Sequence, residues 1–274
     1  MEAVQVVTRD AGGGDVVSTV LIERSHGDAV ATVRLNRPDK RNALTLAMWR
    51  ELEQAFLLLE PDAAVRCVIV RGASGNFAAG ADLAEFPTLR ATAAQAETYG
   101  QHMIAALTAV RDCRHPTIAA IEGLCVGGGL EVAMMCDLRL GAADSRYGIP
   151  IQKVGVAMPY PELAILTQML GRPTMLALLL EGQLRDAAWA ERHGVLTRIA
   201  TDLETDLEAT VGCILTGSPA SHRHHKQFTQ RAVDLLRSLD TEDVRRSYEA
   251  VETADYREGI DAFLARRAPK FTGN

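Results

Sequence analysis

The chain has 274 residues, of which 47% are hydrophobic and 23% are charged, and its formal net charge is −6. This length and balance are typical of one large globular unit, or of a core with an appended subdomain. The acidic balance argues against nucleic acid as a partner, and no uninterrupted apolar run reaches the roughly 18 residues that cross a bilayer. Because the N-terminus also lacks a signal-peptide segment, we expect a cytoplasmic protein with no membrane partner.

Cysteine usage agrees with that compartment. The chain has an odd number of cysteines, and no two of them are close in the sequence: Cys67, Cys113, Cys125, Cys136 and Cys213. They are expected to be buried thiols in a reducing environment. No cysteine or histidine spacing is typical of a zinc site, so we predict no metal.

The first half of the chain begins with predicted strands. Residues 1–15 are expected to form a flexible extension. Strands are predicted over Val16–Glu23 and Ala29–Leu35, and the polar turn between them favours a hairpin. A helix capped by Thr45 and ending near Leu59 follows, because apolar residues recur there at helical spacing.

Strands and helices then alternate. We predict a buried strand over Arg66–Arg71, a helix over Ala91–Arg111, a second buried strand over Thr117–Ile121, and a further strand over Leu138–Leu140. The alternation predicts an α/β core with crossover connections, spanning residues 16–217.

Helices dominate the last third of the chain. Strand patterns become rare from about Pro161, and Ser218-Pro219 marks a boundary. Residues 218–274 are therefore expected to form a separate helical subdomain.

A glycine triplet is the most informative motif. Gly127, Gly128 and Gly129 follow a predicted strand and open an apolar helix, with Glu131 about one turn inside it. Glycine lets a ligand approach the backbone closely, and the first N–H groups of a helix are unpaired. These donors suit an oxyanion, and a neighbouring glutamate suits acid or base catalysis.

A second turn of similar character lies at Phe77–Leu83. It follows a buried strand, Asp82 can cap a short helix there, and the Ala81 N–H is then a free donor. Taken alone, this segment is also explained as an ordinary tight turn. Two such turns facing each other would form an oxyanion hole, in which each donor contributes roughly 3 kcal/mol of transition-state stabilisation.

These motifs, together with three others, occur in the order and spacing of a known family. From about residue 16 onward the chain resembles the enoyl-CoA hydratase/isomerase (crotonase) family. The matching segments are Leu35–Leu44, Phe77–Phe86, Ile121–Asp137, Asp255–Phe263 and Arg266–Phe271.

The resemblance implies a spiral of ββα units followed by a C-terminal helical subdomain that serves in oligomerisation. It also implies homotrimers, often paired into hexamers, and an acyl-CoA substrate whose thioester oxygen is held by the N–H groups of Ala81 and Gly128. Glu131 matches a catalytic glutamate. No cofactor is implied beyond the CoA of the substrate.

The resemblance also implies substrate and CoA contacts. Lys270 has an alternative interpretation as a solvated tail lysine, and its positive charge would otherwise suit a phosphate. The contacts map to Arg41, Ala43, Ala79, Asp82, Leu83, Gly127, Ile151, Lys270 and Phe271.

One position departs from the family's hydratases. They carry two glutamates, the first matching Glu131 and the second matching Ile151. Hydration can divide its proton transfers between two carboxylates, whereas a 1,3-proton shift needs a single base. The sequence therefore predicts an enoyl-CoA hydratase or isomerase. Decarboxylation, dehalogenation, thioester hydrolysis and non-catalytic acyl-CoA binding stay open as alternatives.

The segment after Ile151 also differs from the usual pattern. Pro159 occupies the position of an extra aspartate found in dienoyl-CoA isomerases of the family. Glu162 has two interpretations: a substitute acid near the acyl end, or a carboxylate favoured by the dipole at a helix N-terminus.

Overall fold

The computed structural model describes residues 3–5, 18–234, 245, 249–252 and 254–270. Its strands are β1 (Ala3–Gln5), β2 (Val20–Ser25), β3 (Val30–Leu35), β4 (Cys67–Gly72), β5 (Thr117–Ile121), β6 (Leu124–Val126), β7 (Leu138–Ala142), β8 (Arg146–Gly148), β9 (Arg185–Asp186) and β10 (Arg198–Ala200).

The described helices are α1 (Leu46–Leu59), α2 (Phe86–Leu89), α3 (Ala93–Asp112), α4 (Gly128–Met135), α5 (Tyr160–Leu176), α6 (Ala187–Arg192), α7 (Leu203–Thr216), α8 (Pro219–Asp234) and α10 (Ala254–Leu264). Shorter helical segments are η1 (Pro38–Lys40), η2 (Leu83–Glu85), η3 (Ile151–Val154), η4 (Ala177–Glu181) and η5 (Glu249–Glu252).

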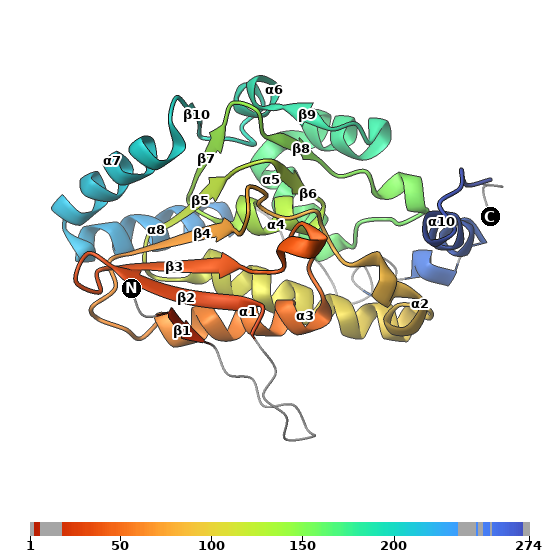
Figure 1. The fold of residues 1–274 in the computed structure, drawn as a ribbon, viewed down its shortest axis with the longest axis horizontal. Helices are drawn as coiled ribbons and strands as arrows, with labels where there is room; N and C mark the ends of the chain where they lie inside the picture. The colour runs from red at the N-terminus through yellow and green to blue at the C-terminus, as the bar shows by residue number, and fades with distance from the viewer. Residues whose placement is uncertain (1–2, 6–17, 235–244, 246–248, 253, 271–274) are drawn as a thin grey trace, which may run out of the picture.

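Two sheets organise these elements. The larger has the order β1-β2-β3-β4-β5-β7-β10, and the smaller has the order β6-β8-β9. From β3 to β10 the neighbouring strands of the larger sheet run parallel, whereas β2 and β3 form an antiparallel hairpin. Figure 1 shows α1 and α3 side by side along the sheet, with α10 at the opposite end of the molecule from α7.

Both faces of the larger sheet are covered. On β4, Val68 and Val70 belong to the core that contains α1 and α3, whereas Cys67 and Ile69 belong to a second core that contains α7. This division follows from the period of two along a strand. It explains why β4 reads as a continuous apolar run in the sequence.

Several predictions are confirmed at this level. The fold class is α/β, the hairpin exists, and the strand over Thr117–Ile121 has the predicted bounds. Thr45 caps α1, since its side chain accepts a hydrogen bond from the Met48 N–H at 3.2 Å.

Other predictions need correction. Most of the segment expected to be a flexible extension lies outside the described residues; within it, Ala3–Gln5 pairs with β2 as an edge strand. Cys213 is exposed, because it lies on an outer face of α7, whereas the other four cysteines are buried as predicted. The short strands β6, β8, β9 and β10 were not predicted, because two or three residues carry no detectable period.

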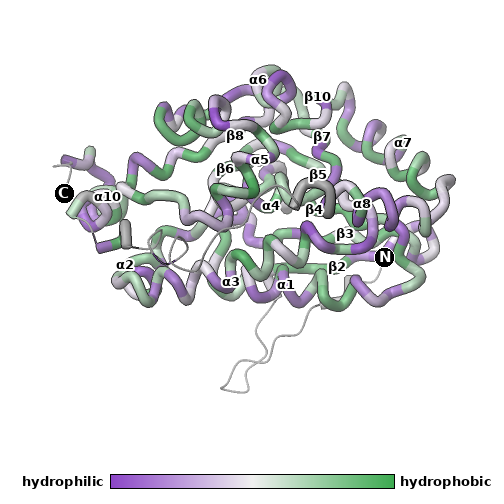
Figure 2. Tube along the Cα trace, turned by 180° about the vertical axis from the view of Figure 1, so that it is seen from behind, coloured by the Kyte–Doolittle hydropathy of each residue, from purple (hydrophilic) through white to green (hydrophobic). Residues whose placement is uncertain are grey.

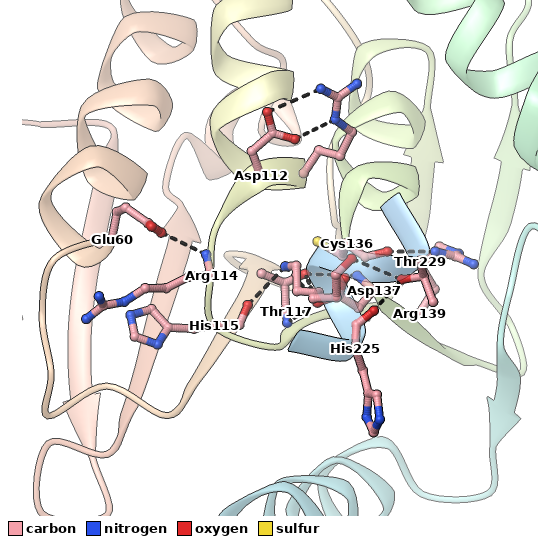
Figure 3. Close-up of polar contacts among 12 residues, drawn as sticks. Glu60, Asp112, Arg114, His115, Thr117, Cys136, Asp137, Arg139, His225 and Thr229 are labelled. Atoms are coloured by element: carbon pink, nitrogen blue, oxygen red, sulfur yellow. Dashed lines mark hydrogen bonds and ion pairs between the residues drawn. The ribbon is translucent and has the colours of Figure 1, made fainter. Parts of the chain in front are cut away.

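Helix α8 is attached to the core through polar contacts. Its sequence is mostly hydrophilic, as its purple colour in Figure 2 shows. Lys226 Nζ donates to the His115 carbonyl at 3.0 Å and pairs with Asp137 Oδ2 at 2.8 Å. Asp137 also accepts from the Thr117 N–H at 2.8 Å, so the cluster in Figure 3 joins α8 to the start of β5.

The α5 region leaves apolar side chains exposed. Tyr160–Glu181, 22 residues long, has the length and composition of a helix that could cross a membrane. Its backbone is broken at Gly171, where φ is 75° and ψ is 154°, and Pro173 follows the break. Leu180 is 71% exposed and Met169 is 44% exposed, so one isolated chain leaves this apolar surface uncovered.

Candidate active site

The turn after β4 is hydrogen-bonded to the strand that leads to the glycine triplet. The Ala78 N–H donates to the Leu124 carbonyl at 2.9 Å, and the Val126 N–H donates back to the Ala78 carbonyl at 3.0 Å. These two bonds fix the turn against β6. Segments that are almost 50 residues apart in sequence thereby become neighbours.

Within this turn, the backbone donors on either side of Ala81 are occupied. The Ala79 N–H donates to the Arg41 carbonyl at 3.0 Å, and the Asp82 N–H donates to the Leu44 carbonyl at 2.8 Å. The Ala81 N–H donates to no backbone carbonyl of the described residues. Its proposed role as a donor to a ligand stays a prediction.

Asp82 stabilises the same turn. Its carboxylate accepts from the Ala84 N–H at 3.1 Å, which confirms the predicted cap, and it pairs with Arg37 Nη1 at 2.7 Å. Arg37 also donates to the Ala43 carbonyl at 3.1 Å. These contacts anchor the loop that follows β3 to the turn that carries Ala81.

The second turn is built by the glycine triplet. Gly127 has φ of 50° and ψ of −123°, and its N–H donates to the Gly148 carbonyl at 2.9 Å. Helix α4 begins at the next residue, and the Glu131 N–H donates to the Gly127 carbonyl at 3.0 Å. Gly128 thus supplies the first helical N–H, which has no partner within a helix.

The two turns touch each other. A Cβ added to Gly127 would lie 3.7 Å from Gly80 Cα, and one added to Gly129 would lie 2.6 Å from Ala78 Cβ. At Gly129 a side chain would separate the turns, whereas at Gly127 glycine is favoured by its positive φ of 50°. Ala81 directly follows Gly80, and Gly128 directly follows Gly127. The N–H groups of Ala81 and Gly128 therefore lie near each other, as the two donors of an oxyanion hole must.

Glu131 lies on the inward face of α4. It is 6% exposed, and its Oε2 has no hydrogen-bond partner among the described residues. Burial raises its pKa to about 7, and the positive charge of Arg90 opposes that rise. A carboxyl group with this pKa can both accept and return a proton near neutral pH.

These elements enclose one cavity of about 490 Å³. It is lined by most of the predicted site residues: Ala43, Ala79, Ala81, Asp82, Leu83, Gly127, Gly128, Glu131 and Ile151. Pro159 also lines it. The cavity therefore contains the position of the missing second glutamate, which is occupied by a half-buried isoleucine.

Two predicted contacts are not among the described residues of this lining. Arg41 is exposed in a left-handed turn with φ of 49°. Lys270 is exposed on the tail, where its backbone N–H donates to Glu258 at 2.6 Å. Phe271 lies outside the described residues.

Two cationic residues that the sequence did not single out line the cavity instead. Lys153 is exposed on η3, and Arg90 is 6% exposed after α2. The Arg90 guanidinium lies 4.4 Å from the centre of the Phe86 ring and 5.3 Å from that of Tyr99. No sequence motif marks either residue, because single basic residues in polar segments are usually at the surface.

A separate cavity of about 590 Å³ lies between the end of α3 and α8, and it is lined mainly by charged residues. Several of its charges are already paired, as Arg111 is with Asp112 at 2.7 Å. Among the described residues, no group of three or more histidines, cysteines or carboxylates could hold a metal ion.

Comparison with known proteins decides the family. The sequence model described as "Enoyl-CoA hydratase/isomerase" matches residues 25–274. The chain belongs to the enoyl-CoA hydratase/isomerase family. The predicted resemblance is thereby confirmed, and the protein is an acyl-CoA enzyme of crotonase type.

Individual members of the family are similar to this chain over nearly its full length. A Mycobacterium bovis protein named "Probable enoyl-CoA hydratase echA8" is 35% identical over 257 residues, covering 93% of this chain and 98% of that protein. An enoyl-CoA hydratase/carnithine racemase from Magnetospirillum magneticum has a TM-score of 0.78 and 43% identity, covering 94% of this chain and 97% of that chain. A methylmalonyl-CoA decarboxylase shares the fold, with a TM-score of 0.84 at 24% identity over 94% of this chain and 99% of its own.

Proposed function

We propose that the protein is an enoyl-CoA hydratase or isomerase in which Ala81 and Gly128 hold the thioester oxygen and Glu131 transfers protons. The observation that carries this proposal is the contact between Gly80 and Gly127, because it brings two free N–H donors together beside a buried glutamate. That combination suits a thioester enolate.

The proposed isomerisation begins with removal of a proton from the acyl chain. The C–H bond breaks, the proton goes to Glu131, and the electron pair moves onto the thioester oxygen. Each backbone donor would stabilise that oxyanion by roughly 3 kcal/mol. Return of the proton to another carbon completes the isomerisation. In hydration Glu131 would instead take a proton from water as the water oxygen bonds to the β-carbon, the electron pair of the double bond would move onto the thioester oxygen, and a proton would then be delivered to the α-carbon.

The described lining of the cavity offers a single carboxylate that is free to act as a base. Glu131 and Asp82 are the carboxylates among its described lining residues, and Asp82 is held by Arg37 at 2.7 Å. One free carboxylate suffices for a 1,3-proton shift. Hydration with Ile151 in place needs Glu131 to serve twice, or needs help from another group.

The CoA part of the substrate is assigned by resemblance and charge. We keep Arg41, Ala43, Ala79, Asp82 and Leu83 as proposed adenine and pantetheine contacts, with Lys270 and Phe271 closing the site. Lys153 is added as a second candidate partner for a CoA phosphate, since it lies at the rim of the same cavity. No further cofactor is part of the proposal.

Arg90 supports a second candidate. A buried guanidinium in the acyl cavity suits an acyl group that carries a carboxylate, because such a pair is hydrogen-bonded and charge-compensated. Loss of CO2 from that acyl group would leave the same thioester enolate in the same oxyanion hole. Decarboxylation is therefore the alternative to test.

Assembly and location complete the proposal. We infer a homotrimer or a dimer of trimers working in the cytoplasm, with residues 218–274 as its oligomerisation subdomain. The exposed apolar side chains of Tyr160–Glu181 support burial of this surface against another copy.

A parallel assay of 2-enoyl- and 3-enoyl-CoA substrates of several chain lengths, read by mass spectrometry, tests the proposed activity. Hydration adds the mass of one water, and isomerisation keeps the mass while the double bond moves. A carboxylated acyl-CoA in the same panel reveals CO2 loss. Binding of the CoA thioesters in a calorimeter without turnover of any of them would contradict an enzymatic function.

A further inference from the structure

A second carboxyl group lies buried beside the proposed catalytic one. Glu162 is in the first turn of α5 and is 1% exposed. Neither of its carboxyl oxygens has a hydrogen-bond partner in another of the described residues. A buried polar group without a partner costs roughly 1–3 kcal/mol, so this side chain calls for an explanation other than stability.

The charged groups around Glu162 indicate an electrostatic role for this side chain. Helices α4 and α5 pack against each other, and α4 carries Glu131. Burial, and then the negative charge of Glu131, raises the pKa of Glu162 to about 8, whereas a hydrogen bond from its own backbone and then the positive charge of Arg90 lower it. The two carboxyl groups therefore interact electrostatically and share one cation.

Other charged groups around the cavity are already engaged or exposed. Asp82 is paired with Arg37, and Lys153 is exposed at the rim. Tyr99 of α3 lies against Arg90, and burial raises its pKa, so its phenol stays neutral. Arg90 can compensate one ionised carboxylate of the Glu131–Glu162 pair but not two.

We propose that Glu162 is the electrostatic partner of Glu131, a positioning residue that supplies from α5 the second carboxyl group that Ile151 does not provide. This inference rests on the proposed function. It differs from the hydratase arrangement, because Glu162 is not among the described residues that line the cavity and acts through Glu131.

The proposed step starts from a pair in which one carboxyl group is ionised and the other is protonated. Two like charges in one buried site cannot both form readily, so the pair loses its first proton well before its second. Glu131 is then the ionised base and takes the proton from the acyl carbon, while Glu162 keeps its own proton. One proton moves to Glu131, one electron pair moves to the thioester oxygen, and the charge of Arg90 is still matched.

The pair should make kcat/KM rise and then fall as the pH increases. Burial raises the pKa of both carboxyl groups, and the negative charge of Glu131 raises that of Glu162 further, so kcat/KM should rise as Glu131 ionises and fall as Glu162 ionises at higher pH. It falls because a second negative charge beside the site opposes the developing enolate. A profile that rises with the first ionisation and falls with the second is the signature of the pair.

Two substitutions test the role of Glu162. Glu162→Gln keeps the shape of the side chain, and Glu162→Met removes its polarity. In both, the falling limb of the pH profile should disappear, because neither side chain can ionise. In Glu162→Met kcat should drop by about 10²-fold, because Glu131 loses its polar partner, whereas in Glu162→Gln, which resembles the protonated acid, kcat should drop less; KM should change little in either. The melting temperature of Glu162→Met should be unchanged or higher, because an unpaired buried carboxyl group has been removed.

A matched control distinguishes this role from a general effect of removing a buried acid. Glu51 is also buried, at 3% exposed, but its Oε2 accepts from the Thr19 and Val20 N–H groups, both at 2.8 Å, away from the cavity. Glu51→Gln should lower the melting temperature and leave both limbs of the pH profile in place.

A persistent falling limb in both Glu162 variants would overturn the inference. Should those variants fail to fold, carbon-13 NMR of the unsubstituted protein with labelled glutamate decides: two carboxyl groups should titrate above pH 6, and finding fewer overturns the pair. In Glu131→Gln the pKa of Glu162 should fall. An active Glu131→Gln enzyme would instead refute the proposed function, so the two failures are distinguishable.

Discussion

At the scale of single residues, Glu131 has the environment that a weak base needs. It is buried on α4 and faces the cavity in which the two turns meet. Burial removes water from the Glu131 carboxylate and raises its pKa, while the positive charge of Arg90 stabilises the ionised form and lowers the pKa. The residue is therefore poised near neutral pH instead of being fully ionised there.

Activity should depend on pH in a direction set by that pKa. Because the base must be ionised, kcat/KM of the best substrate should fall about tenfold for each pH unit below about 7. Initial rates between pH 5 and pH 7 measure this slope. A profile that is flat down to pH 5 would contradict the assignment of Glu131 as the base.

Stability should change with pH in the opposite sense. The pKa values of Glu131 and Glu162 are raised in the folded protein, so the fold binds more protons than the unfolded chain. Their stabilising contribution is complete below about pH 4 and is lost as the pH rises through 7 and 8. Denaturant unfolding at pH 6 and pH 9 should show lower stability at pH 9, with a smaller loss in Glu162→Met.

Some residues of the site could be predicted from the sequence, and others could not. Glu131, Ala81 and Gly128 were predicted because they belong to motifs with a fixed order along the chain. Arg90 was not, because its burial depends on the rings of Phe86 and Tyr99, which only the fold brings around it. Lys153 was missed for the same reason, since nothing local places η3 at the cavity.

At the scale of elements, the contact between the two turns determines the site. Gly129 is the closest point, because a Cβ there would lie 2.6 Å from Ala78 Cβ and 2.8 Å from the Ala78 carbonyl oxygen. Neither atom is the end of a flexible side chain. A larger residue must therefore move α4 away from the turn that carries Ala81.

Gly129→Ala should thus reduce turnover by about 10²-fold, because the two N–H donors no longer converge on one oxygen. Steady-state kinetics beside circular dichroism measure activity and folding separately. Gly212→Ala is a matched control, since an added Cβ on α7 has no atom within 4 Å. It should keep full activity and gain about 0.5–1 kcal/mol of stability; equal activity in both variants would contradict the role of the contact.

Elements with a strong period were predictable, and very short ones were not. Strand β5 is buried at all five positions and α1 has both a cap and an apolar face, so each carried its own signal. The strands β6 and β8 have three residues each and pair with each other across 19 intervening positions. Such pairing is a property of the whole fold.

At the scale of the whole molecule, one surface is unusually apolar. Leu180 and Met169 project from the Tyr160–Glu181 region, where the helix is broken at Gly171. The sequence could not predict this exposure, because a periodic apolar helix is expected to be buried. Burial between copies of the chain is consistent with the trimer that the family resemblance implied.

Light scattering on the purified protein should therefore give the mass of a trimer or a hexamer. Leu180→Lys should shift the mass toward a smaller species, because a buried lysine at an interface is unfavourable. Leu57→Lys is the control, since Leu57 is 52% exposed on α1, away from this surface. A monomeric unsubstituted protein would contradict the proposed assembly.

The most direct test of the central proposal is Glu131→Gln, assayed with whichever enoyl-CoA the unsubstituted protein converts. Loss of the base should reduce kcat by about 10²- to 10⁴-fold, while calorimetric binding of the acyl-CoA is retained, because the donors of Ala81 and Gly128 are unchanged. Full turnover in this variant would contradict the proposed mechanism.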